Sequence, residues 1–204
     1  MPTVSSNGLR RFTVGAAVAF ALLAVAVTGA IKLSGRQIVD VEVYRSYGDA
    51  MESGLVPYRD FPVEYPPGAL PAFVAPSLVT SSPDEHHRVF AVLMALIGAA
   101  GVALTARSLC LLGRSPRTVR AILTVLAVSP AALGGVLLTR FDVLPATLVA
   151  ASMALLLAGR GRSGTAVLGV AAAVKLYPLA LLPLVVAWAW RRRGPREAAL
   201  LAGI

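Results

Sequence analysis

Long apolar runs without a charged residue constrain this chain more than any other feature. The first run covers residues 13–31, and further runs follow at residues 89–106, 121–139 and 143–159. A membrane-spanning helix needs about 20 largely apolar residues. Only 14 % of the 204 residues are charged, whereas soluble domains carry about 25 %, so too little polar surface remains to cover a soluble globule. The sequence therefore predicts an all-α, polytopic transmembrane helical bundle.

Two shorter apolar runs, at residues 163–174 and 176–190, are separated by Lys175. A helix of about 12 residues rises only about 18 Å, which is less than the roughly 30 Å hydrocarbon core of a bilayer. We therefore expect a hairpin of two short helices, which brings the count to six spans. Lys175 at the turn would either line a solvated funnel that opens outward or snorkel to the interface, and the sequence leaves both open.

The proline-rich segment at residues 65–83 decides the orientation of everything that follows it. It is charge-free and long enough to cross, but a crossing would place the later arginines outside, against the positive-inside rule. We therefore expect a re-entrant or interfacial segment. The protein would lie in a bacterial plasma membrane, with its N-terminus in the cytoplasm. The arginines that then fall inside are Arg107, Arg114, Arg117, Arg120, Arg160, Arg162, Arg191, Arg192, Arg193 and Arg196.

The chain is interpreted as one transmembrane domain, residues 1–204, with an extracytoplasmic loop at residues 34–82. Residues 195–204 are typical of the start of a seventh helix, so we expect the chain to be the N-terminal part of a longer protein. The net charge of +9 does not indicate a nucleic-acid partner, because the basic residues are interleaved with apolar runs and basic cytoplasmic loops explain them.

An acidic and aromatic loop precedes the proline-rich segment, and six of the ten acidic residues lie in it, between positions 34 and 65. Residues 37–53 predict an amphipathic helix that ends at Gly54. The i, i+4, i+7, i+11 spacing places four residues on one face, namely Asp40, Tyr44, Tyr47 and Met51. The other side carries residues spaced for ion pairs toward solvent, namely Glu42, Arg45, Asp49 and Glu52.

Asp40 is the one carboxylate on the aromatic face of this helix, which makes it a candidate general base. The alternative is a helix cap or another structural aspartate whose hydrogen bonds are satisfied. Asp40 and Glu42 would share a metal ion only if the backbone were irregular there, because residues two apart on a helix point away from each other. We therefore expect no metal and no other cofactor.

Further charged and aromatic residues lie in the outer loop and at a later helix end. The proline-stiffened part of the loop suits either an interfacial aromatic belt or a surface that stacks against a sugar; its residues are Tyr58, Asp60, Glu64 and Tyr65. Arg140 and Asp142 flank Phe141 at the outer end of the third span, where we expect a local ion pair and a helix cap from Asp142. Charges at a membrane boundary are also functional candidates.

Several of these residues occur in an order that resembles glycosyltransferase family 87. Asp40-x-x-x-Tyr44, followed by residues 54–58 and 61–67, is similar to the first outer loop of these membrane enzymes. They have the GT-C fold and are related to bacterial polyprenyl-phosphate-mannose-dependent mannosyltransferases. The run from Arg140-Phe141-Asp142 to Lys175-Leu176-Tyr177-Pro178 is similar to their middle region, and the resemblance covers most of residues 36–190.

The resemblance implies inverting transfer of a hexose, mannose by analogy, from a polyprenyl-phosphate donor to a glycolipid or glycan acceptor on the outer face. Asp40 would act as the general base, and Arg140 and Lys175 would hold the donor phosphate. The substrate-binding residues would be Tyr44, Tyr58, Asp60, Glu64, Tyr65, Asp142 and Tyr177. A phosphate leaving group needs no general acid, which agrees with a single carboxylate base.

Two other functions fit the same sequence. A polytopic transporter or lipid flippase would share the buried charges, although such proteins often contain inverted repeats and none is visible here. A non-catalytic membrane subunit would tolerate substitution of Asp40.

Overall fold

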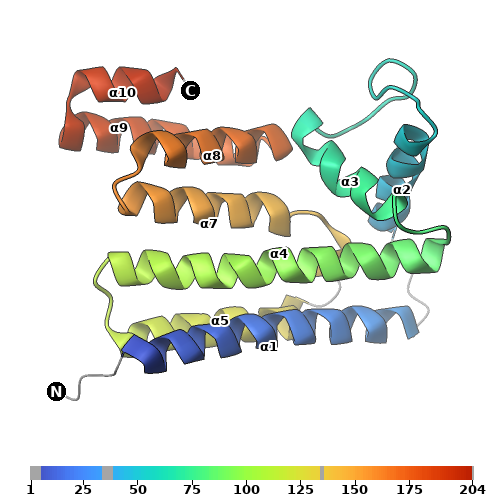
Figure 1. The fold of residues 1–204 in the computed structure, drawn as a ribbon, viewed down its shortest axis with the longest axis horizontal. Coiled ribbons are helices and arrows are strands. Elements are labelled where there is room, and N and C mark those ends of the chain that lie inside the picture. The colour runs from blue at the N-terminus through green and yellow to red at the C-terminus, as the bar shows by residue number, and fades with distance from the viewer. Residues whose placement is uncertain (1–5, 34–38, 134–135, 204) are drawn as a thin grey trace.

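Helices laid side by side make up the fold (Figure 1). The computed structural model describes residues 6–33, 39–133 and 136–203 of the chain. Within these ranges every regular element is helical, which confirms the all-α class predicted from the sequence. The bundle helices are α1 (Ser6–Leu33), α4 (Pro83–Leu111), α5 (Pro116–Leu133), α7 (Val143–Leu157), α8 (Gly161–Val174), α9 (Leu182–Arg193) and α10 (Pro195–Ala202).

Two of the described helices are long and apolar enough to cross a membrane. These are Asn7–Ala30 within α1 and Pro83–Leu111, which is α4. Helix α7 is also apolar, but it has only 15 residues. The prediction of spans at residues 13–31 and 89–106 therefore agrees with the helices found, whereas the full count of six spans is not confirmed.

The run at residues 121–139 is predicted from the sequence as one helix, and its described residues lie in α5 and α6. Helix α5 ends at Leu133, and the short helix α6 (Val136–Thr139) follows. Gly134 and Gly135 lie between them in the sequence, outside the described residues.

Several helix ends agree with their sequence signals. Ser82 Oγ accepts a hydrogen bond from the Glu85 N–H at 3.3 Å at the start of α4, and Ser115 Oγ accepts from the Thr118 N–H at 3.2 Å at the start of α5. Lys175 has an extended backbone (φ −154°, ψ 139°) and separates α8 from the 3₁₀ turn η2 (Tyr177–Leu181), which leads into α9. The predicted break at Lys175 is therefore confirmed.

Small residues let the bundle helices approach closely. A Cβ added to Gly101 in α4 would lie 2.7 Å from Thr147 Oγ1 in α7, and Thr147 donates a hydrogen bond to the carbonyl of Ile97 in α4 at 3.1 Å. Ser152 in α7 donates to the carbonyl of Gly164 in α8 at 2.7 Å. Close backbone approach and hydrogen bonds between helices are what hold helices together in a bilayer, where hydrophobic burial drives association only weakly.

A cap of two short helices covers one end of the bundle (Figure 1, right). The cap consists of α2 (Val39–Glu52) and α3 (Leu70–Ser77), with the 3₁₀ turn η1 (Pro67–Ala69) between them. Helix α2 ends as predicted, because Gly54 follows it with φ 85°, a conformation that glycine adopts freely. Its predicted first residues, 37 and 38, lie outside the described residues. The segment at residues 65–83 contains η1, the eight residues of α3 and the first residue of α4, so it forms no spanning helix.

The opposite end of the bundle, which we call the arginine end, carries many of the basic residues. The N-terminal end of α1, the connection from α4 to α5 and the connection from α7 to α8 lie together there (Figure 1, left). The arginines in these segments are Arg10, Arg11, Arg107, Arg114, Arg117, Arg160 and Arg162. The acidic cap and these seven arginines therefore lie at opposite ends, which agrees with the positive-inside rule.

Candidate functional site

An aromatic cluster lies under the cap and fixes α2. Tyr44 of α2 stacks on Phe73 of α3 with ring centroids 4.5 Å apart, and Phe141 meets the Tyr44 ring edge-on at 5.6 Å. Tyr65 from the loop lies 5.0 Å from Phe141 and 5.6 Å from Tyr44. Tyr44, Phe73 and Phe141 are at most 2 % exposed. The predicted aromatic face of α2, which also carries Tyr47, is therefore the face that packs on the core.

Arg140, Phe141 and Asp142 follow α6 and lead into α7, and each contacts a different part of the molecule. Phe141 is buried in the aromatic cluster. Arg140 Nε donates a hydrogen bond to Asp40 Oδ2 of α2 at 3.0 Å. The local ion pair expected from the sequence is wrong, because the guanidinium reaches a carboxylate 100 residues earlier in the chain instead of the neighbouring Asp142.

Asp40, Arg140, Asp142 and Lys175 form a charged cluster. Lys175 belongs to it from the break between α8 and η2. Its Nζ donates to Asp142 Oδ1 and lies 5.3 Å from the centroid of the Phe141 ring, within cation–π range. Asp142 does not cap α7 as predicted. Its backbone is already helical (φ −58°, ψ −23°) and its side chain makes no capping bond in the described structure, whereas N-cap residues have an extended backbone. Its carboxylate accepts a hydrogen bond from Lys175 instead.

The turn η1 fixes the position of the break at Lys175. A Cβ added to Gly68 would lie 2.6 Å from the backbone carbon and oxygen of Ala173 and 2.8 Å from the nitrogen of Val174. Two backbones approach this closely only because glycine has no side chain. The outer loop and the end of α8 therefore hold each other in place, and with them the lysine that follows Val174.

The Tyr44 hydroxyl is kept neutral by its surroundings. Burial raises its pKa most, and the hydrogen bond with Tyr65 and the negative charges of Asp40 and Asp142 raise it further, far above the usual value of about 10. Each of these causes disfavours the tyrosinate. Tyr44 can therefore donate a hydrogen bond at this site, but it cannot act as a base near neutral pH.

Asp40 and Glu42 contact different partners. Helix α2 is regular through both positions, and Glu42 lies 3.8 Å from Arg45 and 3.7 Å from His87 Nε2. In the described part of the chain, no three His, Cys, Asp or Glu side chains come together in a way that could hold a metal. Arg45 also lies 3.3 Å from Asp49, so the ion pairs predicted along α2 are confirmed.

One polar contact of the cap was missed from the sequence. The helix pattern places Asp49 on the solvent side, yet its Oδ1 also accepts a hydrogen bond from Ser77 Oγ of α3 at 2.9 Å. Ser77 Oγ lies 3.4 Å from Nδ1 of His86, a histidine of α4 that is 1 % exposed. Gly48 is the signal that could have indicated this contact, because a Cβ there would lie 2.5 Å from the Phe73 carbonyl oxygen.

An apolar cavity of about 600 Å³ lies next to the charged cluster. Residues from α1, α4, α5, α6 and α7 line it, and its apolar walls include Phe20, Val102, Leu126 and Leu137. Arg140, Asp142 and Tyr177 also line it. Lys175, for which the sequence left a place in the lining of a funnel open, does not line this cavity and is connected to it through its bond with Asp142. A ligand with an apolar chain and a polar group fits such a lining.

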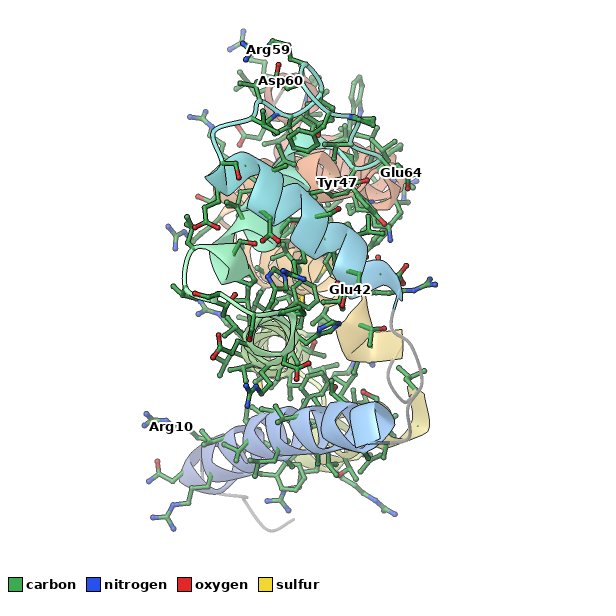
Figure 2. The ribbon with its side chains drawn as sticks, turned by 90° about the vertical axis from the view of Figure 1, so that its right-hand side faces the viewer. Arg10, Glu42, Tyr47, Arg59, Asp60 and Glu64 are labelled. Atoms are coloured by element: carbon green, nitrogen blue, oxygen red, sulfur yellow. The ribbon has the colours of Figure 1, made fainter. Side chains whose placement is uncertain are left out.

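The other predicted substrate-binding residues lie apart from this cluster. Tyr58 and Asp60 lie in the loop beyond the C-terminal end of α2, whereas Asp40 lies in its first turn. Figure 2 shows Asp60 at the tip of the molecule and Glu42 near the other end of α2. Glu64 is exposed between them. Their contacts with a substrate stay predictions.

The loop tip is folded on itself. Arg59 Nε lies 2.9 Å from Asp60 Oδ1, and Asp60 Oδ2 accepts from the Val56 N–H at 2.8 Å. Tyr58 has φ 65°, which is uncommon for a residue other than glycine, and its hydroxyl donates to the Tyr65 carbonyl at 2.5 Å. Tyr65 therefore connects the tip to the aromatic cluster.

Comparison with known proteins identifies the family. Residues 63–204, more than half of the chain, match glycosyltransferase family 87. No curated protein and no solved structure matches the chain. The matched residues include Arg140, Asp142 and Lys175, and they begin after Asp40 and the rest of α2. The chain belongs to glycosyltransferase family 87.

Proposed function

We propose that this membrane glycosyltransferase transfers a hexose, mannose by family resemblance, from a polyprenyl-phosphate donor to a glycolipid or glycan acceptor. Membership of the family implies glycosyl transfer, and the donor, the acceptor and the catalytic base are our proposal. The observation that carries it is the charged cluster of Asp40, Arg140, Asp142 and Lys175 beside an apolar cavity.

The cavity favours a donor with a lipid chain. Its walls are largely apolar, and Arg140 brings a guanidinium to them. Guanidinium groups bind phosphate through two parallel hydrogen bonds, and an ammonium group such as that of Lys175 adds a second positive charge. We place the polyprenyl chain in the cavity and the phosphate between Arg140 and Lys175.

Asp40 supplies the base that the reaction needs. Its carboxylate accepts the proton of the acceptor hydroxyl while that oxygen attacks the anomeric carbon from the face opposite the phosphate. The new bond from carbon to the acceptor oxygen forms, and the bond from carbon to the phosphate oxygen breaks with its electron pair remaining on the phosphate. The anomeric configuration is therefore inverted. Arg140 and Lys175 stabilise the charge that develops on the phosphate.

We place the cap on the outer face of a bacterial plasma membrane, with the N-terminus inside. The support is the separation of charge along the bundle, since the arginine end and the acidic cap are at opposite ends (Figure 1). Basic segments stay preferentially in the cytoplasm. The proposed site then faces outward, where a lipid-linked sugar and a glycan acceptor would both reach it.

Replacing Asp40 tests the proposal. Asp40→Asn keeps the size of the side chain but cannot accept the proton, so sugar transfer should fall by about 10²–10⁴, the usual contribution of a general base. Glu42→Gln is the matched control, because Glu42 belongs to the same helix but contacts Arg45 and His87 instead of the charged cluster. The measurement is transfer of radiolabelled sugar from a polyprenyl-phosphate donor in membranes that contain wild-type protein or either variant.

Near-normal transfer by the Asp40→Asn protein would contradict the assignment and leave Asp40 as a structural partner of Arg140. An equal loss in both variants would instead point to a role shared by Asp40 and Glu42. Membrane content of each variant, measured by immunoblotting, separates lost catalysis from lost protein.

A further inference from the structure

The two cations that we assign to the donor phosphate are both held by carboxylates in this structure. Arg140 is paired with Asp40 at 3.0 Å, and Lys175 is paired with Asp142. The two ion pairs have different consequences for the proposed reaction. Asp142 has no assigned step in the transfer, whereas Asp40 is the proposed base, and one of its oxygens is occupied by the Arg140 N–H.

The geometry makes the Arg140–Asp40 pair the easier one to open. The Arg140 side chain is 55 % exposed, whereas that of Lys175 is 36 % exposed and lies over the Phe141 ring. Exposed ion pairs are weak, and a phosphate offers a guanidinium two parallel bonds. The backbone between the two pairs is held by Phe141, which is buried in the aromatic cluster, so opening the pair needs movement of the Arg140 side chain alone.

We propose that Arg140 exchanges its bond with Asp40 for a bond with the donor phosphate, and that Asp40 becomes free to act as a base only when the donor is bound. This inference rests on the function proposed above and adds an order of events to it. The donor binds first, its phosphate withdraws Arg140 from Asp40 Oδ2, and Oδ2 is then available to the acceptor hydroxyl. Without donor, Oδ2 remains bonded to the guanidinium.

Binding of decaprenyl phosphate to the purified protein tests the exchange without any turnover. If Asp40 competes with phosphate for Arg140, Asp40→Asn should bind the lipid about two- to fivefold more tightly, which is the equilibrium equivalent of an exposed ion pair. Arg140→Gln should bind it more weakly than wild type. In the double variant, Asp40→Asn should bring no gain, because the cation for which it competes is absent. Glu42→Gln should bind like wild type.

The outcomes separate this inference from the proposed function. Weaker binding by Arg140→Gln together with unchanged or weaker binding by Asp40→Asn would overturn the exchange and leave the phosphate site in place. A gain from Asp40→Asn that persists in the double variant would also overturn it. Unchanged binding by Arg140→Gln would contradict the phosphate site itself. Asp40→Ser serves as a second variant, and thermal unfolding of every protein shows whether the fold is intact.

Discussion

The two ends of the bundle carry opposite charges and use them differently. Under the cap, charged side chains pair between elements that are far apart in the sequence, as Asp40 does with Arg140. At the arginine end, Arg120 lies over the ring of Phe12 at 5.8 Å, and Arg162 approaches Glu197 at 3.7 Å. Most arginines there are exposed, as Arg107 is.

Under the function and orientation that we propose, the difference corresponds to two uses of charge in a membrane protein. Charges that orient a protein act through their sum and need no fixed geometry, because the membrane responds to the number of basic residues near each span. Charges that take part in binding or catalysis must be held in place by their neighbours. The aromatic cluster supplies such support under the cap, since Phe141 holds the residues on both sides of it.

A topology experiment tests the difference between the two ends most directly, because it shows whether they face different sides of the membrane. Ser53→Cys in the loop after α2 and Ser115→Cys before α5 should respond in opposite ways to a membrane-impermeant thiol reagent, with complete labelling at residue 53 and none at residue 115. Both positions are exposed, and Cys110 must first be replaced by Ala because it is exposed too. Permeabilised cells provide the control, since both cysteines should then react. Labelling of residue 115 alone in intact cells would reverse the proposed orientation.

Removing one aromatic ring at each end tests whether packing is concentrated under the cap. Phe141→Ala should lower the free energy of unfolding by about 3–5 kcal/mol, because the ring is 1 % exposed and contacts Tyr44, Tyr65 and Phe73. Phe12→Ala should cost clearly less, because this ring is half-buried at the arginine end. Unfolding in detergent measures both. Equal losses would mean that the two ends are packed alike.

A smaller effect is expected from adding one methyl group where the outer loop meets α8. Gly68→Ala would place a Cβ 2.6 Å from the Ala173 backbone, and such overpacking typically costs about 1–3 kcal/mol. It should also lower donor binding by displacing Lys175. Gly15→Ala in α1 is the matched control, because nothing lies within 4 Å of a Cβ there, and alanine favours a helix by about 1 kcal/mol over glycine. A Gly68→Ala protein as stable as the Gly15→Ala protein would contradict the close approach.

Features that depend on neighbouring residues were predictable from the sequence. The aromatic face of α2, its end at Gly54, the ion pairs of Arg45 and the break at Lys175 all follow from local spacing and composition, and the structure contains them. They are set by helix periodicity and by the conformational preferences of single residues.

The partners within the charged cluster were not predictable in the same way. Arg140 pairs with a residue 100 positions away and Lys175 with one 33 positions away, so both depend on how the helices pack. The local cap predicted for Asp142 failed because the backbone there is already helical. The sequence resemblance had placed Arg140 and Asp40 in one reaction, but it gave no reason for them to touch.

The three consecutive residues Arg140, Phe141 and Asp142 also limit how the length of the chain can vary. These three consecutive residues between α6 and α7 contact Asp40, the aromatic cluster and Lys175 in turn, so an inserted or deleted residue here would move at least one of them away from its partner. The loop tip around Tyr58 and Asp60 makes its contacts within itself or through Tyr65. Natural and engineered insertions and deletions should therefore occur mainly at that tip. The spacing from Arg140 to Asp142 should stay fixed, even where the amino acids themselves are exchanged.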